Sequence, residues 1–351
     1  MTKMTMRKTL IYLFILSAAA VSILSCKKDK TETLPDLNGK PYFDMVTYAA
    51  REQMIEVTPY GVTHPKGKGI GYAWRISALS QKLDTVKFED EKFDSSYTFT
   101  TPKDAMTTSV ICMAFAEGYN NAYYTRTLMV VDPRFGFTLT DNGIKTTQIG
   151  YYDSRDIDVS PEFRKYYYLR TDKLDWYRQN LGYTRMGKPY ANCKVMSYVL
   201  GRYYSWNEAM TACPDGWRLP TSEEFEEFVG GSLEGVAGSL MVNARFNGDE
   251  MWEYWPEVDI TNSLDFCAIP AGYAWFGGED GKDEFAGINE FATFWTSDEN
   301  PSNDTQARYY YLNVKKPDLY KAWGDKKSFG ASVRCVRESG GTGPVGPTPG
   351  F

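Results

Sequence analysis

Histidine is nearly absent from this sequence: among its 351 residues the only one is His64, in the segment Thr63-His64-Pro65. Serine–histidine–aspartate triads, cysteine–histidine pairs and multi-histidine zinc sites all need an imidazole held in a pocket. A histidine beside a proline in a turn is expected at the solvated surface. The sequence therefore argues against most hydrolase chemistries. Carboxylate-pair chemistry of the glycosidase type has acids available, but no pair stands out.

An excess of basic residues is also missing. The sequence has 39 Lys and Arg against 45 Asp and Glu, a formal net charge of −6 at pH 7. A basic stripe that would neutralise nucleic-acid phosphates is therefore not expected, and no nucleic-acid partner is predicted. No sequence pattern asks for a cofactor or a metal ion, and we predict that the chain is not an enzyme.

The N-terminal residues predict export. Residues 1–25 have the form of a signal peptide, with basic residues before a short apolar segment at 10–24 that is too short to span a bilayer comfortably. The sequence Ile23-Leu24-Ser25-Cys26 matches the lipobox of bacterial lipoproteins, in which the cysteine is acylated and becomes the mature N-terminus. Each buried methylene of such a chain contributes about 0.8 kcal/mol to anchoring. We expect an outer-membrane lipoprotein, on the periplasmic or the cell-surface face, held to the membrane by lipid on Cys26.

Polar segments lie at both ends of the mature chain. Residues 26–36 predict a flexible tether, because a composition rich in Lys, Thr and acids cannot bury a core. Residues 339–351 alternate Gly, Pro and Thr and predict an unstructured tail. Cleavage before Cys26 removes three basic residues and no acid, which takes the formal charge from −6 to −9. The mature length of 326 residues suggests about two domains.

Cysteine is scarce, and each one needs an assignment. Besides Cys26, which is expected to carry lipid, the chain has Cys112, Cys193, Cys213, Cys267 and Cys335. An exported protein meets an oxidising compartment, where pairing is expected. Five is an odd number, so at least one of these stays unpaired or pairs elsewhere. Cys112 is predicted to be a small buried apolar residue, since the strands before it offer no partner.

Short strand patterns fill residues 37–133. Turn signals separate segments of strand type at 54–57, 69–78, 96–100, 108–115 and 122–131, with no helix between them. This spacing predicts an all-β antiparallel sandwich that ends at Asp132-Pro133. Trp74 inside a strand and Tyr97-Thr98-Phe99 before a Pro-Lys turn make the region similar to the immunoglobulin-like (Ig) and PKD-like domains of bacterial surface proteins.

Two capping boxes mark short helices in a second, α+β domain at residues 137–338. Ser205 with Glu208 opens the first helix, whose apolar face is formed by Trp206, Ala209, Met210 and Cys213. Thr221 with Glu224 opens the second helix, which ends at Gly230-Gly231. Strands are predicted further on at 266–270, 291–296, 309–314 and 331–336, with long loops at 277–289 and 297–305.

Motifs across this second domain resemble one known family. They include Gly216-Trp217-Arg218-Leu219-Pro220-Thr221 and Ser332-Val333-Arg334-Cys335-Val336-Arg337, with further matches at 176–183, 201–206, 209, 212–214, 270–273 and 294–297. In this order they resemble the Fibrobacter succinogenes major paralogous domain, the FISUMP family. The resemblance implies an exported lipoprotein or surface protein, because members are typically of these kinds and have no defined activity.

The same residues are similar to the C-type lectin-like fold, which formylglycine-generating enzymes share. There a helix of pattern Ala-x-x-x-Cys leads into a Gly-x-x-Leu turn, and the helical cysteine pairs with one on the last strand. Ala209, Cys213, Gly216 and Leu219 match this pattern, and Cys335 lies on the final strand. The resemblance therefore implies a Cys213–Cys335 disulfide. Cys193 and Cys267 are unusual for the family, and a second bridge between them is an open alternative.

Departures from the lectin pattern affect function. The loop Glu299-Asn300-Pro301-Ser302-Asn303-Asp304 has the wrong order for calcium-dependent sugar binding, and no Trp-Asn-Asp strand occurs, so a plain solvated turn is expected. Formylglycine-generating activity requires a redox-active cysteine pair that holds copper, which a structural Cys213–Cys335 bridge would not supply.

Three functions fit the sequence. The first is a non-catalytic, lipid-anchored binding module for a carbohydrate or a surface protein, contacted by loop aromatics at Trp252, Tyr254, Trp255, Tyr273 and Trp275. The alternative is a structural subunit of a surface appendage or adhesin. An enzyme, either formylglycine-generating-like or carboxylate-based, is the third. These rings could instead fill the core, since aromatic side chains are usually buried.

Overall fold

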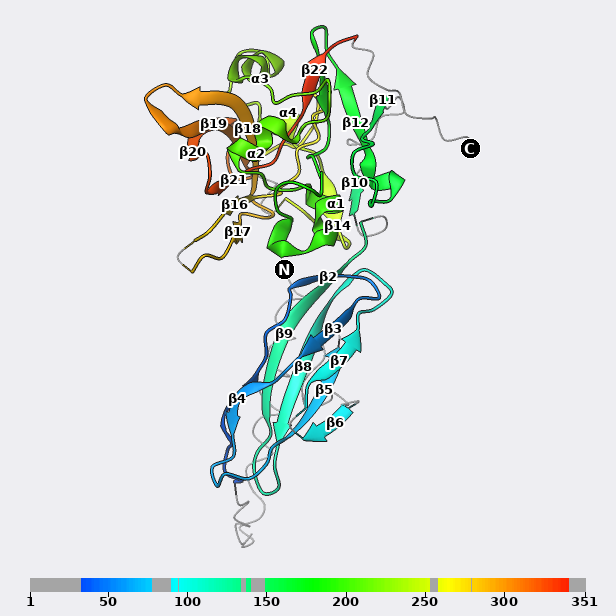
Figure 1. The fold of residues 1–351 in the computed structure, drawn as a ribbon, viewed down its shortest axis with the longest axis vertical. Coiled ribbons are helices and arrows are strands. Elements are labelled where there is room, and N and C mark those ends of the chain that lie inside the picture. Colours follow the sequence, from blue (N-terminus) through cyan, green and yellow to red (C-terminus); the bar gives the residue numbers. More distant parts are fainter. Residues whose placement is uncertain are drawn as a thin grey trace, which may run out of the picture.

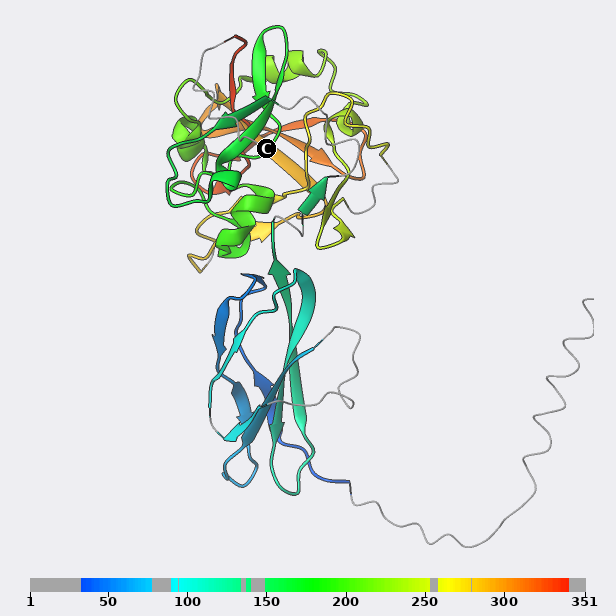
Figure 2. The same cartoon turned by 90° about the vertical axis from the view of Figure 1, so that its right-hand side faces the viewer.

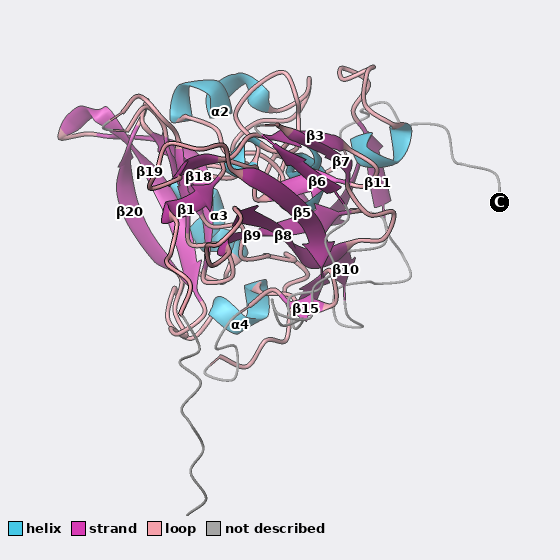
Figure 3. Cartoon of the chain, turned by 90° about the horizontal axis from the view of Figure 1, so that it is seen from below, coloured by secondary structure: helices cyan, strands magenta, loops and turns pink. Residues whose placement is uncertain are grey.

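A computed structural model of the chain describes residues 33–77, 90–93, 95–133, 137–139, 149–252, 258–278 and 280–340. The protein is rich in β-structure, with a few short helices (Figure 3). Cys26, Tyr254 and Trp255 lie outside the described residues. Within the ranges above, no helix is long and apolar enough to cross a membrane.

The first part of the chain forms two layers of strands (Figures 1 and 2). One layer is a five-stranded sheet of order β2(Tyr48–Ala50), β9(Ala122–Val131), β8(Met106–Phe115), β5(Gly71–Ser77) and β6(Asp90–Phe93). The other layer holds two pairs, β1(Asn38–Tyr42) with β4(Tyr60–Thr63) and β3(Met54–Val57) with β7(Tyr97–Thr100). Pairing is antiparallel except between β2 and β9, which are parallel, so the predicted all-antiparallel pairing is wrong at this edge.

Side chains that point inward from the strands of both layers form the core between them. Trp74 of β5 is buried and stacks on Tyr97 of β7, with ring centroids 5.4 Å apart. Cys112 is fully buried, as predicted, and burial raises the pKa of its thiol to about 12. His64 is buried as well, because its ring packs against Tyr119 and its Nδ1 accepts a hydrogen bond from the Lys66 amide. The prediction of a solvated histidine was wrong.

The second part of the chain holds the remaining sheets. One sheet has the order β11(Ile149–Tyr152), β12(Lys165–Arg170), β13(Leu174–Tyr177) and β22(Val336–Glu338), and a second has the order β17(Glu284–Ala286), β16(Tyr273–Trp275) and β21(Phe329–Gly330). A third sheet consists of β18(Phe291–Asn300), β19(Asn303–Asn313) and β20(Tyr320–Asp325). The fourth sheet consists of β10(Phe137–Leu139), β14(Ala244–Phe246) and β15(Asp249–Glu250). Two buried clusters fill the space between these sheets and the helices. The sheet of β11, β12, β13 and β22 joins the beginning of this part to its end.

Both predicted capping boxes are confirmed. Ser205 and Thr221 cap α2(Trp206–Ala212) and α3(Ser222–Phe228). Each side chain accepts a hydrogen bond from the amide of its glutamate, and each backbone amide donates to the carboxylate of that glutamate. Gly230 and Gly231 follow α3 with positive φ, and their amides donate to carbonyls of the last turn. The apolar face of α2 is narrower than predicted, since Met210 is 44% exposed. Two one-turn helices, α1(Ser197–Leu200) and α4(Ala237–Leu240), were not predicted.

Some predicted strands are replaced by single bridges. Residues 266–270 and 331–336 make isolated pairs, such as Met241 with Ala268 and Phe294 with Ser332, and only β22 continues as a strand. Conversely, the predicted loop at 297–305 is the tip of the hairpin between β18 and β19, with a register shift near Glu299. Single bridges satisfy buried backbone groups without the period-two pattern of a regular strand.

The two parts meet where β9 leads into the second part (Figure 1). Tyr48 of β2 packs edge-on against Tyr190, with centroids 5.5 Å apart. The Asn247 side chain donates a hydrogen bond to the Val130 carbonyl at 2.8 Å. Val131 belongs to a cluster whose other fully buried residues come from the second part, with Tyr48 and Met129 of the first part packed against it. Apolar packing as well as chain connection therefore joins the two parts.

Candidate ligand-binding site

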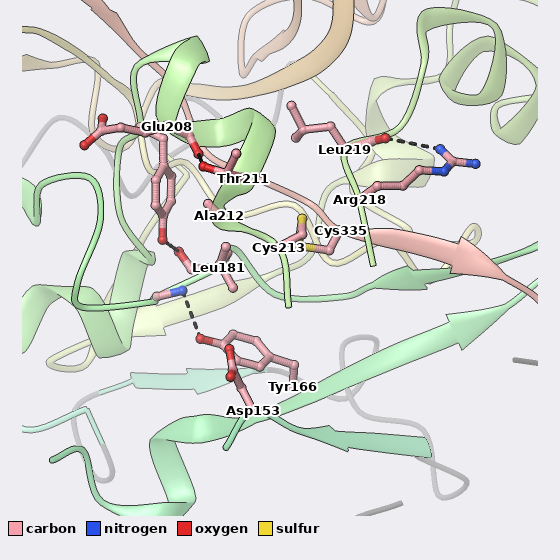
Figure 4. The surroundings of a disulfide bond; sticks show 12 residues. Asp153, Tyr166, Leu181, Glu208, Thr211, Ala212, Cys213, Arg218, Leu219 and Cys335 are labelled. Carbon is pink, nitrogen blue, oxygen red and sulfur yellow. Dashed lines mark hydrogen bonds between the residues drawn. A yellow bond between two sulfur atoms is a disulfide. The ribbon is translucent and has the colours of Figure 1, made fainter. Parts of the chain in front are cut away.

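The Cys213–Cys335 disulfide that the lectin-like resemblance implied is present. It joins the residue after α2 to the segment before β22, with Cα atoms 5.8 Å apart and a sequence separation of 122 (Figure 4). The bridge lies in a buried cluster that includes Trp217, Tyr177 and Leu219. Arg155 stabilises the end of α2 next to the disulfide, because its guanidinium donates hydrogen bonds to the carbonyls of Ala212 and Cys213.

The open alternative of a second bridge is not realised in the structure, where Cys193 and Cys267 both keep their thiols. The two sulfurs have different surroundings. Cys193 is half-buried at the junction of the two parts, and Cys267 is buried beside Arg178, whose guanidinium donates to its sulfur at 3.3 Å. Burial raises the pKa of both thiols.

Trp252, predicted as a ligand contact, belongs to the core. Its side chain is only 3% exposed, and its indole N–H donates to the Val242 carbonyl at 3.1 Å. A ring with its polar group satisfied inside a cluster cannot stack on an external ligand, so this prediction was wrong. Tyr254 and Trp255, predicted with it, lie outside the described residues.

Tyr273 and Trp275 occupy a different position, on β16. Trp275 is 43% exposed, and Tyr273 is half-buried. Both rings contact the buried ring of Phe329 on the neighbouring strand β21. The centroid distance is 5.1 Å from Trp275 and 5.9 Å from Tyr273. The structure therefore brings these two of the predicted residues together and leaves them accessible.

They belong to a larger group of rings. Contacts run from Tyr273 to Phe291 at 5.9 Å, from Phe291 to Tyr311 at 6.3 Å, and from Tyr311 to Tyr309 and Tyr320 at 5.9 Å and 5.2 Å. All are half-buried except Trp275, which is exposed. We call this set the aromatic face; its members are Tyr273, Trp275, Phe291, Tyr309, Tyr311 and Tyr320.

Strand register explains why these rings share one side. Side chains alternate along a strand, so Tyr309 and Tyr311 of β19 point the same way. Phe291 lies two positions from Thr293, which pairs with Tyr311, and Tyr320 pairs with Tyr311 on the other edge. The opposite side of the sheet carries Tyr310, which is buried against α3, so each side of β19 has its own role.

The aromatic face offers rings and hydroxyls. No hydrogen-bond partner for the hydroxyls of Tyr273, Tyr309 or Tyr311 is found among the described residues. Burial, followed by the neighbouring Tyr311 and Tyr273, raises the pKa of Tyr309, so its hydroxyl stays protonated at neutral pH. Beneath the rings, Trp295 is buried and donates its indole N–H to the Tyr204 carbonyl. The arrangement can bind a ligand non-covalently through stacking and hydrogen bonds.

The sequence reasoning missed Phe291, Tyr309, Tyr311 and Tyr320. A usable signal was present, since Tyr309 and Tyr311 are spaced by two within a predicted strand, which puts both on one side. The pairing that adds Phe291 and Tyr320 was not legible, because it depends on which strands become neighbours.

A sequence model of the family described as Fibrobacter succinogenes major domain matches residues 139–337, more than half of the chain. The chain belongs to this family. The Fibrobacter succinogenes major domain contains the Cys213–Cys335 disulfide and all six members of the aromatic face. A search of the curated proteins finds no match to the chain.

In the Fibrobacter succinogenes major domain, the hairpin turn at 299–304 is stabilised by hydrogen bonds from its own side chains. Asn300 accepts a hydrogen bond from the Ser302 amide, and Asn303 accepts from the amide and hydroxyl of Thr305. These side chains support the turn itself. Across the described ranges, no group of three or more His, Cys, Asp or Glu is placed to hold a metal ion.

Proposed function

We propose that the protein is a lipid-anchored cell-envelope protein that binds a glycan through the aromatic face and is not a catalyst. The observation that carries this is the aromatic face itself, which a single sheet and its neighbouring hairpin leave partly accessible. Five of its rings are connected by direct contacts, and Trp275 is linked to them through the buried ring of Phe329. Accessible apolar surface gathered in one place marks an interaction site. Isolated surface rings would carry no such meaning.

A glycan suits this surface chemically. A sugar ring has an apolar face of C–H groups, which stacks on aromatic rings, and hydroxyls around its edge, which need donors and acceptors. Tyrosine and tryptophan combine an apolar body with a polar group in the same way. The hydroxyls of Tyr273, Tyr309 and Tyr311 are available for such contacts.

Non-catalytic binding fits the ionisable groups. The aromatic face has no imidazole or thiol among its members, and the Asp318 carboxylate beside it accepts a hydrogen bond from the Tyr320 hydroxyl at 3.4 Å. Burial raises the pKa of Cys193 and Cys267, and a protonated thiol is a poor nucleophile and metal ligand. Cys213 and Cys335 are joined to each other. The formylglycine-generating-like alternative therefore has little support.

Two finer assignments of fold belong to this proposal. A C-type lectin-like fold for the second part is supported by the disulfide from the end of α2 to the segment before β22 and by the two capped helices. An Ig- or PKD-like fold for the first part is supported by its two layers packed around Trp74. In this arrangement the first part is a spacer between the anchor and the binding domain.

The lipid anchor rests on the lipobox before Cys26. Expression of the intact gene and of Cys26→Ser in a bacterium, followed by membrane fractionation and labelling with a radioactive fatty acid, tests it. We expect the intact protein to be labelled and to sediment with membranes, and Cys26→Ser to be unlabelled and released. A labelled Cys26→Ser protein would refute the anchor without affecting the glycan proposal.

The glycan proposal is tested with the detergent-purified full chain on an array of bacterial and plant polysaccharides, followed by titration of the best binder. Trp275→Ala and Tyr320→Ala should each weaken binding about tenfold, which corresponds to about 1.4 kcal/mol. The matched control is Trp323→Ala, because Trp323 is a half-buried tryptophan on the opposite side of the same sheet, where it stacks on Arg308.

Two results would contradict the proposal. One is glycan binding that survives both substitutions in the aromatic face. The other is an array without any binder combined with a self-assembled species in size-exclusion chromatography. The second would favour the alternative of a structural subunit, in which the aromatic face contacts a neighbouring copy.

A further inference from the structure

A cavity separate from the aromatic face lies where the second part of the chain begins. Its volume is about 410 Å³, within the range of small-molecule sites. It is bounded by η2(Pro161–Arg164), β12, the segment 179–182 and α1, and Pro133 at the end of the first part also lines it. We call it the arginine pocket, because the side chains of Arg178 and Arg334 both line it.

Arg334 is the unusual group of the arginine pocket. It is 1% exposed, and it donates to the Asn180 side chain at 2.8 Å and to the carbonyls of Tyr177, Phe266 and Cys267 at 3.1, 2.7 and 3.0 Å. A guanidinium has five N–H bonds, so these four contacts leave one N–H without a partner among the described residues. Burial is the main cause that lowers the pKa of Arg334 to about 9; Cys267 opposes this shift and the neighbouring Arg178 adds to it.

No carboxylate of the described residues pairs with Arg334, in contrast to Arg178. Arg178 donates to the Asp265 carboxylate at 2.5 Å. Arg334 contacts only neutral oxygens, with the rings of Phe266 and Phe294 at 4.5 Å and 5.3 Å from its guanidinium carbon. Buried charges in proteins are usually paired. Arg334 therefore leaves a positive charge beside an accessible cavity without a countercharge.

The turn that receives Arg334 is held in a costly conformation. Asn262, Asp265 and Cys267 all have positive φ, at 48°, 59° and 57°. Residues other than glycine rarely adopt positive φ, and residues with such backbone conformations are concentrated at functional sites. The strain is maintained by the bonds of Arg178 to Asp265 and of Arg334 to the carbonyls of Phe266 and Cys267.

The arginine pocket combines an apolar wall with charged and polar side chains. Phe163 of η2 and Tyr198 of α1 stack on each other, with centroids 4.3 Å apart and planes at 13°. Val199 and Ile269 add aliphatic surface. Three cationic side chains line the cavity, Lys165, Arg178 and Arg334, against one carboxylate, the exposed Glu162. The Cys267 thiol is neutral, because burial raises its pKa.

We propose that the arginine pocket binds a small molecule that joins one carboxylate to an apolar body. The carboxylate accepts the remaining N–H of Arg334 and supplies the missing countercharge, while the body packs against Phe163, Tyr198 and Ile269. Charge-assisted bonds to a guanidinium are the strong ones in such sites. This site does not depend on the aromatic face, and the two can be occupied independently.

The test is calorimetric titration of the full chain with benzoate, 4-phenylbutyrate and indole-3-acetate, each beside its own neutral primary amide. We expect at least one acid to bind with a 1:1 stoichiometry and at least tenfold more tightly than its amide. Tyr198→Ala should weaken that acid at least fivefold by removing the apolar wall. Tyr320→Ala, a half-buried tyrosine of the aromatic face, is the matched control and should leave the affinity unchanged.

Arg334→Lys addresses the charge directly, but this variant loses bonds that hold the 262–267 turn and can fail to fold. The comparison of acid with amide keeps the proposal testable without it. The proposal is overturned if no acid binds more tightly than its amide, or if binding is insensitive to Tyr198→Ala. A loss of acid binding in Tyr320→Ala instead would place the acid on the aromatic face and overturn it too.

Discussion

The two parts of the chain are held together in different ways. The first part is a layered core in which neighbouring strands bury alternate side chains, with Trp74 at its centre. The second part is tied across long stretches of sequence, by a disulfide spanning 122 residues and by Arg334, which bonds to Asn180 at a separation of 154. One depends on local hydrophobic alternation, and the other depends on specific polar and covalent contacts.

A third long tie in the second part is ionic. The Asp175 carboxylate is buried between Arg170 and Arg337, at 2.7 Å and 3.0 Å. Arg337 is separated from Asp175 by 162 residues and also donates to the Tyr168 hydroxyl. The beginning and end of this part are therefore joined at several points. We therefore expect a substitution at one end of the second part to destabilise its other end as well, and to leave the stability of the first part unchanged.

The largest expected effect comes from removing the disulfide. Replacing Cys213 and Cys335 together by Ala should destabilise the second part by about 3–5 kcal/mol, because the unfolded chain regains the entropy of a long loop. Hydrogen exchange followed by mass spectrometry reports each part separately. Peptides around Trp176 should exchange faster, and peptides around Trp74 should be unchanged.

The reciprocal variant is Trp74→Ala, which leaves a cavity in the first part and should cost it a similar amount. Its exchange pattern should be the mirror image, with faster exchange around Trp74 alone. If either variant accelerates exchange in both parts equally, the contact of Tyr48 with Tyr190 couples them into one unit and the contrast drawn above is wrong.

An intermediate effect is expected at Asp175. Asp175→Asn keeps the shape but leaves Arg337 without its charged acceptor, so the second part should lose about 2–3 kcal/mol. Burial raises the pKa of Asp175, but the hydrogen bonds and charges of Arg170 and Arg337 outweigh it, and the pKa lies below the ordinary 3.8.

The pH dependence follows from this direction. Because the folded-state pKa is lowered, the stability from the ionised carboxylate is present above the unfolded pKa and is lost as the pH falls through the folded value. The advantage of the native protein over Asp175→Asn, measured by urea unfolding, should therefore be nearly constant from about pH 5 to about pH 7, roughly one to three units above the unfolded pKa, and shrink below about pH 4. A difference that persists unchanged to lower pH would mean that Asp175 acts through its shape alone.

The sequence predicted the local features of both parts well. The strands around Trp74 and both capping boxes follow from patterns within ten residues, and short-range sterics decide them. Single bridges at 266–270 were predicted as a strand, because an apolar segment has the same appearance whether it pairs continuously or once. The burial of His64 depends on Tyr119, more than fifty positions away, which no local pattern reveals.

Prediction of the candidate sites was less complete for the same reason. Trp275 was found because it is an aromatic residue in a loop-rich segment, but the same argument selected Trp252, which is buried. Composition does not distinguish a ring in the core from one at the surface. The arginine pocket had no signal of its own, since Arg334 appeared only within a family motif, and its cavity depends on segments far apart in the sequence that the fold brings together.

The smallest expected effect concerns the helix caps, which are local contacts inside the part held by long ties. The Ser205 hydroxyl accepts a hydrogen bond from the Glu208 amide, and the Glu208 carboxylate accepts one from the Ser205 amide at 3.0 Å. Ser205→Ala should cost about 1 kcal/mol, as loss of an N-cap usually does. Thr211→Ala, an exposed threonine on the same helix, is the control and should stay within about 0.5 kcal/mol of the native protein in urea unfolding. If Ser205→Ala costs as much as removal of the disulfide, then α2 is not a local element. The Glu208 carboxylate, which also accepts a hydrogen bond from the Gly187 amide at 3.1 Å, would then join α2 to a segment 21 residues away and matter for more than the helix cap.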